Sequence, residues 1–150
     1  MISITGVPGS GKTYLSSRLR EKGFHVTGLN EVAREHGCIT HDIVDIECLK
    51  SVIASLNPQI AEAHYSHLLP CNAVIMVEAS ENVLRERLRH RGYSDFKIEE
   101  NIAALLSDSI FYEALDRLPR NRIMIVNTSN DINADDMKNI SEFINRFIMG

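Results

Sequence analysis

The strongest constraint on this chain lies near its first residue, where positions 6–13 read Gly-Val-Pro-Gly-Ser-Gly-Lys-Thr. This run matches the pattern G-x-x-x-x-G-K-[ST], and each part of the pattern has a mechanical reason. Glycines let the backbone bend around an anion with several N–H groups pointing inward, and the following helix adds the positive end of its dipole. The sequence therefore predicts a phosphate-binding loop and, with it, nucleotide binding.

The residues on both sides of the loop support this interpretation. Ile2 and Ile4, with Ser3 and Thr5, are typical of a short strand that enters the loop. Tyr14, Leu15 and Leu19 indicate the inner face of a helix that leaves it. Lys12 is expected to reach the β- and γ-phosphates, and Thr13 to offer its hydroxyl to Mg²⁺. An ordinary Gly-rich turn is disfavoured, because loop, lysine, threonine, strand and helix all agree.

The composition indicates one globular domain, residues 1–150, of which 44% are hydrophobic. Sixteen basic and twenty acidic residues give a formal charge of −4, which argues against broad attraction to nucleic acid or membranes but leaves a local basic face open. No stretch approaches the ~20 apolar residues of a membrane span. Met1 leads directly into the first expected strand, so no signal peptide is expected. We therefore predict a cytoplasmic protein.

The three cysteines give no sign of a disulfide framework or a zinc site. Cys38, Cys48 and Cys71 are odd in number and lack C-x-x-C spacing. Buried or neutral thiols are the expected state of all three.

Apolar runs and helical spacing alternate along the chain. The expected strands are 2–5, 24–27, 59–63, 73–77 and 122–127. One expected helix follows the loop from residue 14. The other expected helices cover 31–36, 46–56, a segment capped by Ser80, 98–118 and 134–149, and a small extended piece is expected at 43–45. This alternation predicts an α/β protein with the three-layer fold of P-loop NTPases, in which helices cover both faces of a five-stranded parallel sheet. Ligands should bind at the carboxyl ends of the strands.

An arginine pair at Arg87 and Arg91 is the first feature that narrows the reaction. Residues four apart on a helix point the same way, so both guanidinium groups are candidates for stabilising the charge of a transferred phosphoryl group. The structural alternative is a solvated basic helix end, favoured by the helix dipole. We favour the catalytic interpretation because the pair precedes the interruption at Gly92.

Two weaker features lie between the second and fourth expected strands. An element inserted over residues 28–50 would hold the phosphate acceptor in a small kinase, and Arg34 would bind the acceptor's phosphate bidentately, although an arginine on a short helix is more often a surface residue. Glu62 could hold Mg²⁺ through water, and His64 could orient water or an acceptor. His64 and His67 form a lone H-x-x-H pair without further ligands, so a transition-metal site is disfavoured.

Several short motifs resemble the small adenylate kinase family of archaea and eukaryotic nuclei, the adenylate kinase isoenzyme 6 type. The matching segments are Gly6 to Thr13, Leu29-Asn30, Ala33-Arg34-Glu35, Ile43-Val44-Asp45, Glu62-Ala63-His64, Arg87-Leu88, Arg91-Gly92-Tyr93 and Lys97-Ile98-x-x-Asn101. They cover roughly the first two-thirds of the chain. The phosphate loop is shared by many families, whereas the Arg-Gly-Tyr turn with Lys and Asn downstream is much more specific.

The resemblance implies reversible phosphoryl transfer in which ATP and AMP give two ADP with Mg²⁺. Residues 28–50 would be the AMP-binding element and residues 90–101 a short lid. The implied ATP ligands are Gly9, Ser10, Gly11, Lys12, Thr13, Tyr14 and Arg91. The implied AMP ligands are Asn30 and Arg34. The implied catalytic residues are Lys12, Arg87, Arg91 and His64. The implied magnesium ligands are Thr13 and, through water, Glu62.

Two other functions stay open. Family members also hydrolyse ATP and act in maturation of the small ribosomal subunit, so the resemblance allows an ATPase assembly factor that binds a ribosomal protein. A kinase for another small metabolite would need Arg34 and its neighbours to bind something other than a monophosphate. The chain also departs from the family, because Glu62 stands where eukaryotic members have Asp and the loop at 127–130 is only loosely similar. The lid lacks the Cys cluster of zinc-bearing lids.

Overall fold

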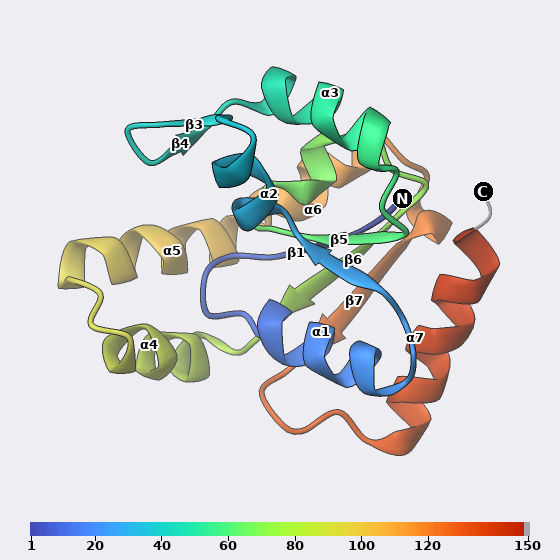
Figure 1. Ribbon diagram of the computed structural model, residues 1–150. Helices are drawn as coiled ribbons and strands as arrows, with labels where there is room; N and C mark the ends of the chain where they lie inside the picture. Colours follow the sequence, from blue (N-terminus) through green and yellow to red (C-terminus); the bar gives the residue numbers. More distant parts are fainter. Residues whose placement is uncertain (149–150) are drawn as a thin grey trace.

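A five-stranded parallel sheet forms the centre of the computed structural model, which describes residues 1–148 (Figure 1). Its strands are β1 (Ile2–Thr5), β2 (Val26–Gly28), β5 (Ile60–Glu62), β6 (Ala73–Glu78) and β7 (Ile123–Asn127). They lie in the order β2-β5-β1-β6-β7, and every pairing is parallel. All four residues of β1 are buried, as expected for a central strand covered on both faces. The predicted α/β fold is confirmed.

Helices pack on both faces of this sheet. On one face, α1 (Lys12–Glu21) and α7 (Ala134–Phe147) bury their apolar residues against β1, β6 and β7. On the other, α3 (Ile46–Leu56) covers β5, and α6 (Ser109–Leu115) covers β6 and β7. Among residues 1–148, no helix is long and apolar enough to cross a membrane. Residue 149 of the last predicted helix lies outside the described part of the chain.

Residues 28–50, called the insertion below, form a small subdomain beside the second strand. It contains α2 (Leu29–Glu35), a hairpin of β3 (Ile39–Thr40) and β4 (Ile43–Val44), and the start of α3. His41 and Asp42 at the tip of the hairpin both have positive φ, the conformation of a two-residue hairpin turn. A separate apolar cluster of α2, α3 and the end of β5 supports the insertion.

The cysteine prediction was wrong for two of the three thiols. Cys38 and Cys48 form a disulfide, whereas Cys71 keeps a free thiol. Spacing rules missed the bond because the β3–β4 hairpin folds the chain back and brings the two Cα atoms to 5.5 Å, within the usual range for disulfides. The bond joins the start of the hairpin to the first turn of α3.

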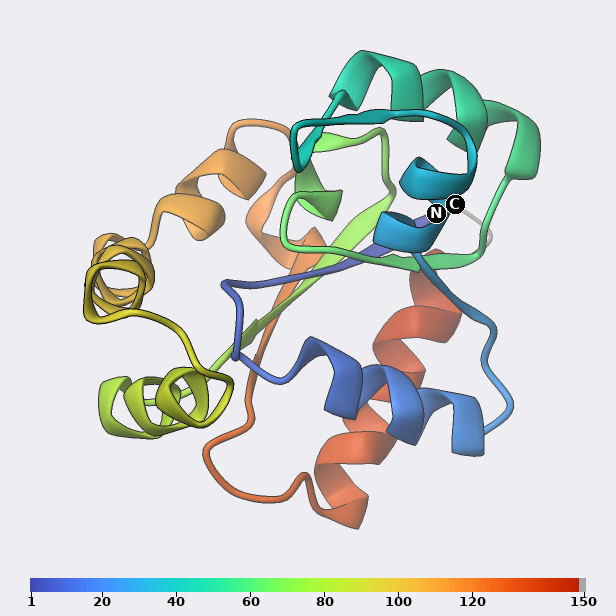
Figure 2. The same ribbon diagram turned by 60° about the vertical axis from the view of Figure 1, so that its left-hand side comes forward.

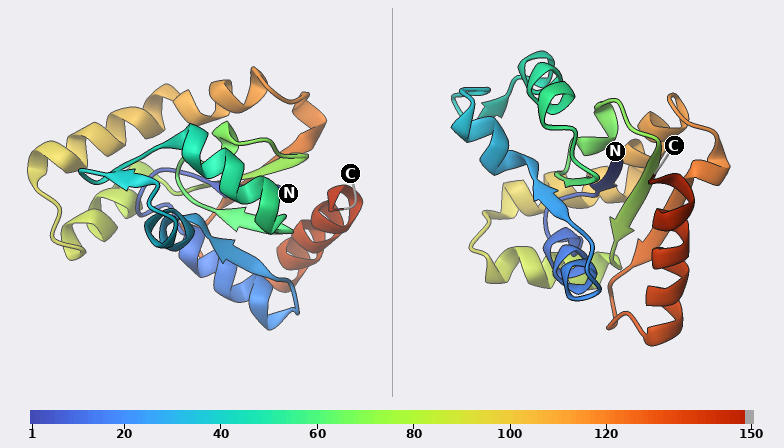
Figure 3. Two further views of the ribbon diagram at one scale, coloured as in Figure 1. Left: turned by 45° about the horizontal axis from the view of Figure 1, so that its top comes forward. Right: turned by 45° about the vertical axis from the view of Figure 1, so that its right-hand side comes forward.

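The helix predicted over residues 98–118 is divided into two. α5 (Asp95–Ser107) ends at Asp108, whose φ of 53° breaks the helix before α6 begins. The preceding helix, α4 (Glu81–His90), packs antiparallel to α5 through an apolar cluster that includes Leu84, Leu88 and Ile98. Figures 2 and 3 show this pair at the opposite end of the molecule from the last turns of α7.

Candidate functional site

The phosphate loop joins the end of β1 to the start of α1, and two of its glycines are required by close contacts. A Cβ on Gly6 would lie 2.4 Å from the carbonyl oxygen of Val77, and one on Gly11 would lie 2.5 Å from Oγ1 of Thr128. Gly11 also has a φ of 107°, in the region that favours glycine. The loop therefore fits tightly between β6 and the segment that follows β7.

Lys12 lies at the first turn of α1 and folds back over the loop. Its Nζ donates hydrogen bonds to the carbonyl oxygens of Gly6 at 2.9 Å and Val7 at 3.1 Å. Burial lowers the pKa of Lys12 to about 8, an effect that nearby Arg91 reinforces and Glu62 opposes. An ammonium group with little solvation gains strongly from an anionic partner, so this position favours a bound phosphate.

A pocket of about 320 Å³ opens beside Lys12 at the carboxyl ends of β1 and β5. Its lining residues are Pro8, Lys12, Thr13, Asn30, Glu62, Ala63, His64, Arg91 and Tyr93. The structure thus brings together six residues singled out in the sequence, from the phosphate loop, the insertion, the end of β5 and the end of α4. Two cationic side chains and several neutral donors make the pocket suited to phosphate groups.

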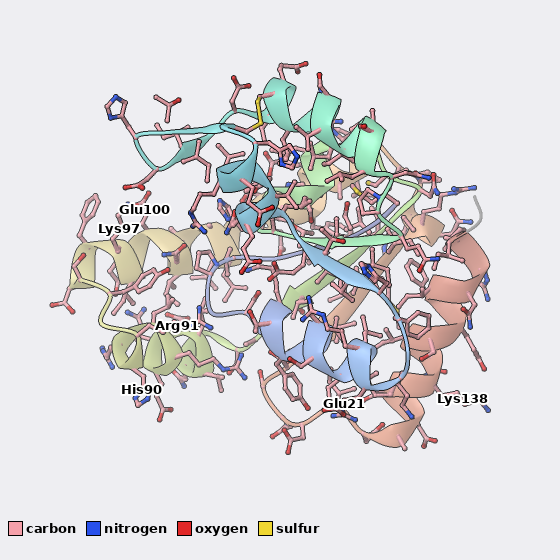
Figure 4. The ribbon with its side chains drawn as sticks, viewed as in Figure 1. Glu21, His90, Arg91, Lys97, Glu100 and Lys138 are labelled. Carbon is pink, nitrogen blue, oxygen red and sulfur yellow. A yellow bond between two sulfur atoms is a disulfide. The ribbon has the colours of Figure 1, made fainter. Side chains whose placement is uncertain are left out.

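A second pocket, of about 580 Å³, continues from the first one toward solvent. It shares Pro8, His64 and Tyr93 with the first pocket and is otherwise lined by Asp42, Lys97, Glu100 and Asn101. Asp42 belongs to the hairpin of the insertion, and the other three belong to α5. In Figure 4, Lys97 and Glu100 lie on the side of α5 that faces the hairpin, and Arg91 lies at the end of α4. The insertion and the α4–α5 pair therefore form the two walls of one cleft.

The two arginines of α4 have different surroundings, although sequence reasoning expected both to face the phosphates. Arg91 lines the smaller pocket. Arg87 donates to the carbonyl oxygen of Gly9 at 3.1 Å, to Oγ1 of Thr128 at 3.0 Å and to the carbonyl oxygen of Thr128 at 2.6 Å. Arg87 therefore fastens the phosphate loop to the segment after β7, and its direct catalytic role stays a prediction.

The acidic and imidazole groups of the site lie at the end of β5. Burial raises the pKa of the Glu62 carboxyl, an effect that the charge of Lys12 opposes. Burial lowers the pKa of His64, and the charge of Lys12 adds to this effect. The His64 imidazole is therefore neutral near pH 7, which suits a group that orients a water molecule or an acceptor.

His67 does not join His64 in a shared site. Its Nδ1 lies 2.7 Å from Oγ1 of Thr5, and its Nε2 lies 3.0 Å from Oε1 of Glu113 on α6. Both ring nitrogens therefore have partners within the protein, and the side chain is only 2% exposed. His67 ties the last residue of β1 to α6, which explains the H-x-x-H spacing without a metal.

The remaining predicted residues lie at the edges of the site. The Tyr14 hydroxyl accepts hydrogen bonds from Arg18 at 2.9 Å and from the backbone of Ile132 at 3.0 Å, so it anchors the loop after β7 to α1. Arg34 is exposed on α2, one turn from Asn30. Sequence reasoning missed the loop contact of Thr128 as well as Tyr65, whose hydroxyl donates to Asn30 at 2.8 Å.

Comparison with known proteins places this site in a family. Residues 2–107 match the family model described as AAA domain. A protein of Thermoplasma acidophilum named "Putative adenylate kinase" is 46% identical over 131 residues, which cover 87% of this chain and 88% of that protein. Another of that name, from Archaeoglobus fulgidus, is 40% identical over 77% of this chain and 67% of that protein. The chain belongs to the small archaeal adenylate kinase family. The resemblance inferred from the sequence motifs is thereby confirmed.

Solved structures outside the small adenylate kinases share the fold. A shikimate kinase from Bacteroides thetaiotaomicron has a TM-score of 0.56 at 17% identity and covers 97% of this chain and 94% of its own. A gluconokinase from Sinorhizobium meliloti has a TM-score of 0.56 at 19% identity and covers 99% and 93%. These likenesses concern the fold alone. The relatives that are 46% identical over most of the chain support the coarser statement that this is a nucleotide-binding kinase.

Proposed function

We propose that this protein catalyses reversible Mg²⁺-dependent phosphoryl transfer between ATP and AMP, forming two ADP. The observation that carries the proposal is the pocket of about 320 Å³, which joins the phosphate loop to Asn30 of the insertion and to Arg91 of α4. A hydrolase needs the phosphate loop but has no use for a second nucleotide element. The names of the archaeal relatives support the same reaction.

The donor phosphates are held by the loop that begins at Gly6. The loop amides and Lys12 bind the β- and γ-phosphates, and Arg91 reaches the transferred group from the opposite wall of the pocket. Arg87 keeps the loop in shape through Gly9 and Thr128. Phosphoryl transfer depends mainly on positioning and charge stabilisation, so no strong general base is required.

Magnesium fits the oxygen donors of the pocket. Thr13 offers a hydroxyl on the first turn of α1 and Glu62 a carboxylate at the end of β5, and both side chains line the same pocket as Lys12. Thr13 would bind the ion directly and Glu62 through water, because Mg²⁺ retains several of its waters. When bound, the ion neutralises charge on the donor phosphates.

The acceptor is assigned to the cleft between the insertion and α5. Asn30 and Arg34 lie one turn apart on α2, so they share one side of that helix and together offer donors to a phosphate. His64 stands where the two pockets meet and can orient the attacking group. Approach of the two walls would exclude water, which otherwise competes as the acceptor.

One alternative follows if the second pocket holds water in place of an acceptor. A cleft of about 580 Å³ that adjoins the phosphate pocket leaves room for water beside the donor. Hydrolysis of ATP would then be the main reaction, as in an assembly factor whose cycle is coupled to a protein partner such as a small-subunit ribosomal protein. AMP phosphorylation would be secondary in that case.

One assay separates the two functions. ADP formation from Mg·ATP is measured with and without AMP, while AMP consumption and free phosphate are followed separately. Two ADP per AMP consumed, with little free phosphate, supports the kinase. Phosphate release that is indifferent to AMP and rises when a ribosomal protein is added supports the ATPase. Turnover with neither pattern in folded protein would contradict both.

A further inference from the structure

Tyr65 lies directly behind two of the predicted site residues. It follows β5 in the turn that leads into the short 3-10 helix Ser66–Leu68, and its side chain is 6% exposed. Its hydroxyl donates a hydrogen bond of 2.8 Å to Oδ1 of Asn30, on α2 of the insertion. Its ring packs edge-on against the His64 imidazole, with 5.0 Å between ring centroids.

The protonation state of Tyr65 allows the phenol to act as the donor in this hydrogen bond. Burial, with a contribution from the negative charge of Glu62, raises the pKa of the Tyr65 phenol to about 12. The phenol therefore keeps its proton at every pH in the working range of the enzyme. A phenolic hydroxyl can donate or accept, and in the structure it donates to Oδ1 of Asn30.

The amide of Asn30 is left with only donors for the pocket. A side-chain amide has one oxygen and one NH₂ group, and with the oxygen engaged by Tyr65 the NH₂ group remains for a ligand. Asn30 itself lines the pocket of about 320 Å³. Without Tyr65 this exposed amide is free to turn over and to present its oxygen, which repels a phosphate.

Arg34 extends this donor surface by one helical turn. Asn30 and Arg34 are four residues apart on α2, so their side chains lie on one side of the helix. One contributes an NH₂ group and the other a guanidinium, and neither offers an acceptor while Tyr65 holds the amide. Such a surface matches an anionic group on the acceptor rather than the edge of a base, which presents both donors and acceptors.

We propose that Tyr65 is a positioning residue, which locks the amide of Asn30 so that its NH₂ group donates to a phosphate oxygen of the acceptor nucleotide. The inference rests on the proposed phosphoryl transfer and deepens it. It assigns recognition of the acceptor's phosphate to Asn30 and Arg34, and it assigns to the buried Tyr65 the orientation of the Asn30 amide.

The test replaces Tyr65 by phenylalanine, because Tyr65→Phe keeps the ring against His64 and removes only the hydroxyl. We expect the KM for AMP to rise about fivefold to tenfold, in keeping with the loss of one oriented hydrogen bond, while the KM for ATP and kcat change less than twofold. Binding of AMP without ATP, measured by calorimetry, should weaken by the same factor. Tyr112→Phe on α6, where the side chain is 60% exposed, is the matched control.

A double-mutant cycle shows whether Tyr65 acts through Asn30. In an Asn30→Ala background, the further change Tyr65→Phe should leave AMP binding within twofold, because no amide remains to be oriented. Equal effects of Tyr65→Phe in both backgrounds, or a wild-type KM for AMP in the single variant, would overturn the proposal. A wild-type protein that does not phosphorylate AMP would instead reject the proposed function itself.

Discussion

The phosphate loop and the insertion meet at one pocket, but the protein holds them in different ways. The loop is fixed by close contacts, since Gly6 and Gly11 have no room for a Cβ and Arg87 binds it to Thr128. The insertion shares an apolar cluster with the end of β5 and carries its own disulfide, and its hairpin is open to solvent, with Ile43 72% exposed. The donor side is therefore held by tight contacts with β6 and the segment after β7, and the acceptor side by packing against the end of β5 and by its disulfide. Changes on the two sides should affect different steps.

The largest effect is expected on the donor side, from Lys12→Ala. Loss of the ammonium should lower kcat/KM by about a hundredfold or more, because this charge acts directly on the transferred group. Thermal unfolding should confirm an intact fold. Lys22→Ala, at an exposed position just after α1, serves as the control. Unchanged turnover in folded Lys12→Ala would reject the assignment of the phosphate loop.

On the acceptor side, Arg34→Ala should weaken the use of AMP much more than the hydrolysis of ATP. We expect about a tenfold or greater rise in the KM for AMP with a much smaller change in ATP hydrolysis, because a charge-assisted contact to the acceptor's phosphate is lost. Steady-state kinetics with each substrate varied in turn measure this difference. Arg146→Ala, at an exposed position in the last turn of α7, which packs on the other face of the sheet from α3, should behave as wild type. Equal losses in both reactions would place Arg34 on the donor side.

The pH dependence of ATP binding tests the role of Lys12 on the donor side. Because burial lowers the pKa of Lys12 to about 8, the ligand-free protein loses this positive charge as the pH rises through that value. The Kd for ATP should therefore rise by up to about tenfold per pH unit above pH 8, with proton uptake on binding. Calorimetry in two buffers of different ionisation enthalpy measures both quantities. A flat Kd without proton uptake between pH 7 and 9.5 would contradict the lowered pKa.

The depressed pKa also has a defined effect on stability. A lysine with a pKa of about 8 in the folded protein and an ordinary value of 10.5 binds more protons when the chain is unfolded. The contribution of Lys12 to the free energy of unfolding therefore rises with pH between these values, and it is unfavourable below pH 8. Bound phosphate would relieve this cost.

The smallest effect is expected from the disulfide of the insertion. Cys38 and Cys48 are separated by 10 residues, and closing a loop of that length contributes about 2–3 kcal/mol to stability in the chain-entropy model. Reduction, or Cys48→Ser, should lower thermal stability and raise the KM for AMP severalfold, with little change in the KM for ATP. Thiol titration before and after reduction gives the state of the bond. Equal changes in both KM values would show that the two sides are not held independently.

The sequence predicts the donor side well because its determinants are local. The eight residues from Gly6 to Thr13 specify the loop by themselves, and the apolar runs around them indicate the five parallel strands. The break at Asp108 was missed because neither glycine nor proline marks it, and the apolar spacing from Ile98 continues across it. Here a single residue with positive φ redirects the chain so that α6 can pack on the sheet.

The acceptor side was harder to predict because its contacts join distant residues. Nothing in the spacing of Cys38 and Cys48 reveals the hairpin that brings them together. Tyr65 and Asn30 are 35 positions apart, and they meet only once β2 pairs with β5. On the donor side the same limit applies to Arg87, which has the helical spacing of a phosphate ligand, yet its partner Thr128 lies 41 residues later. Local patterns identify candidate side chains, whereas the pairing of strands decides which atoms those side chains meet.

The contact between the phosphate loop and Thr128 has a consequence for the order in which the protein is made. Thr128 follows the last strand, and its hydroxyl donates to the carbonyl oxygen of Ser10, 118 positions earlier in the chain. A growing polypeptide that has left the ribosome only as far as α6 already contains the whole phosphate motif but not the residue that secures it. The nucleotide site is therefore completed only after all five strands of the sheet have been made.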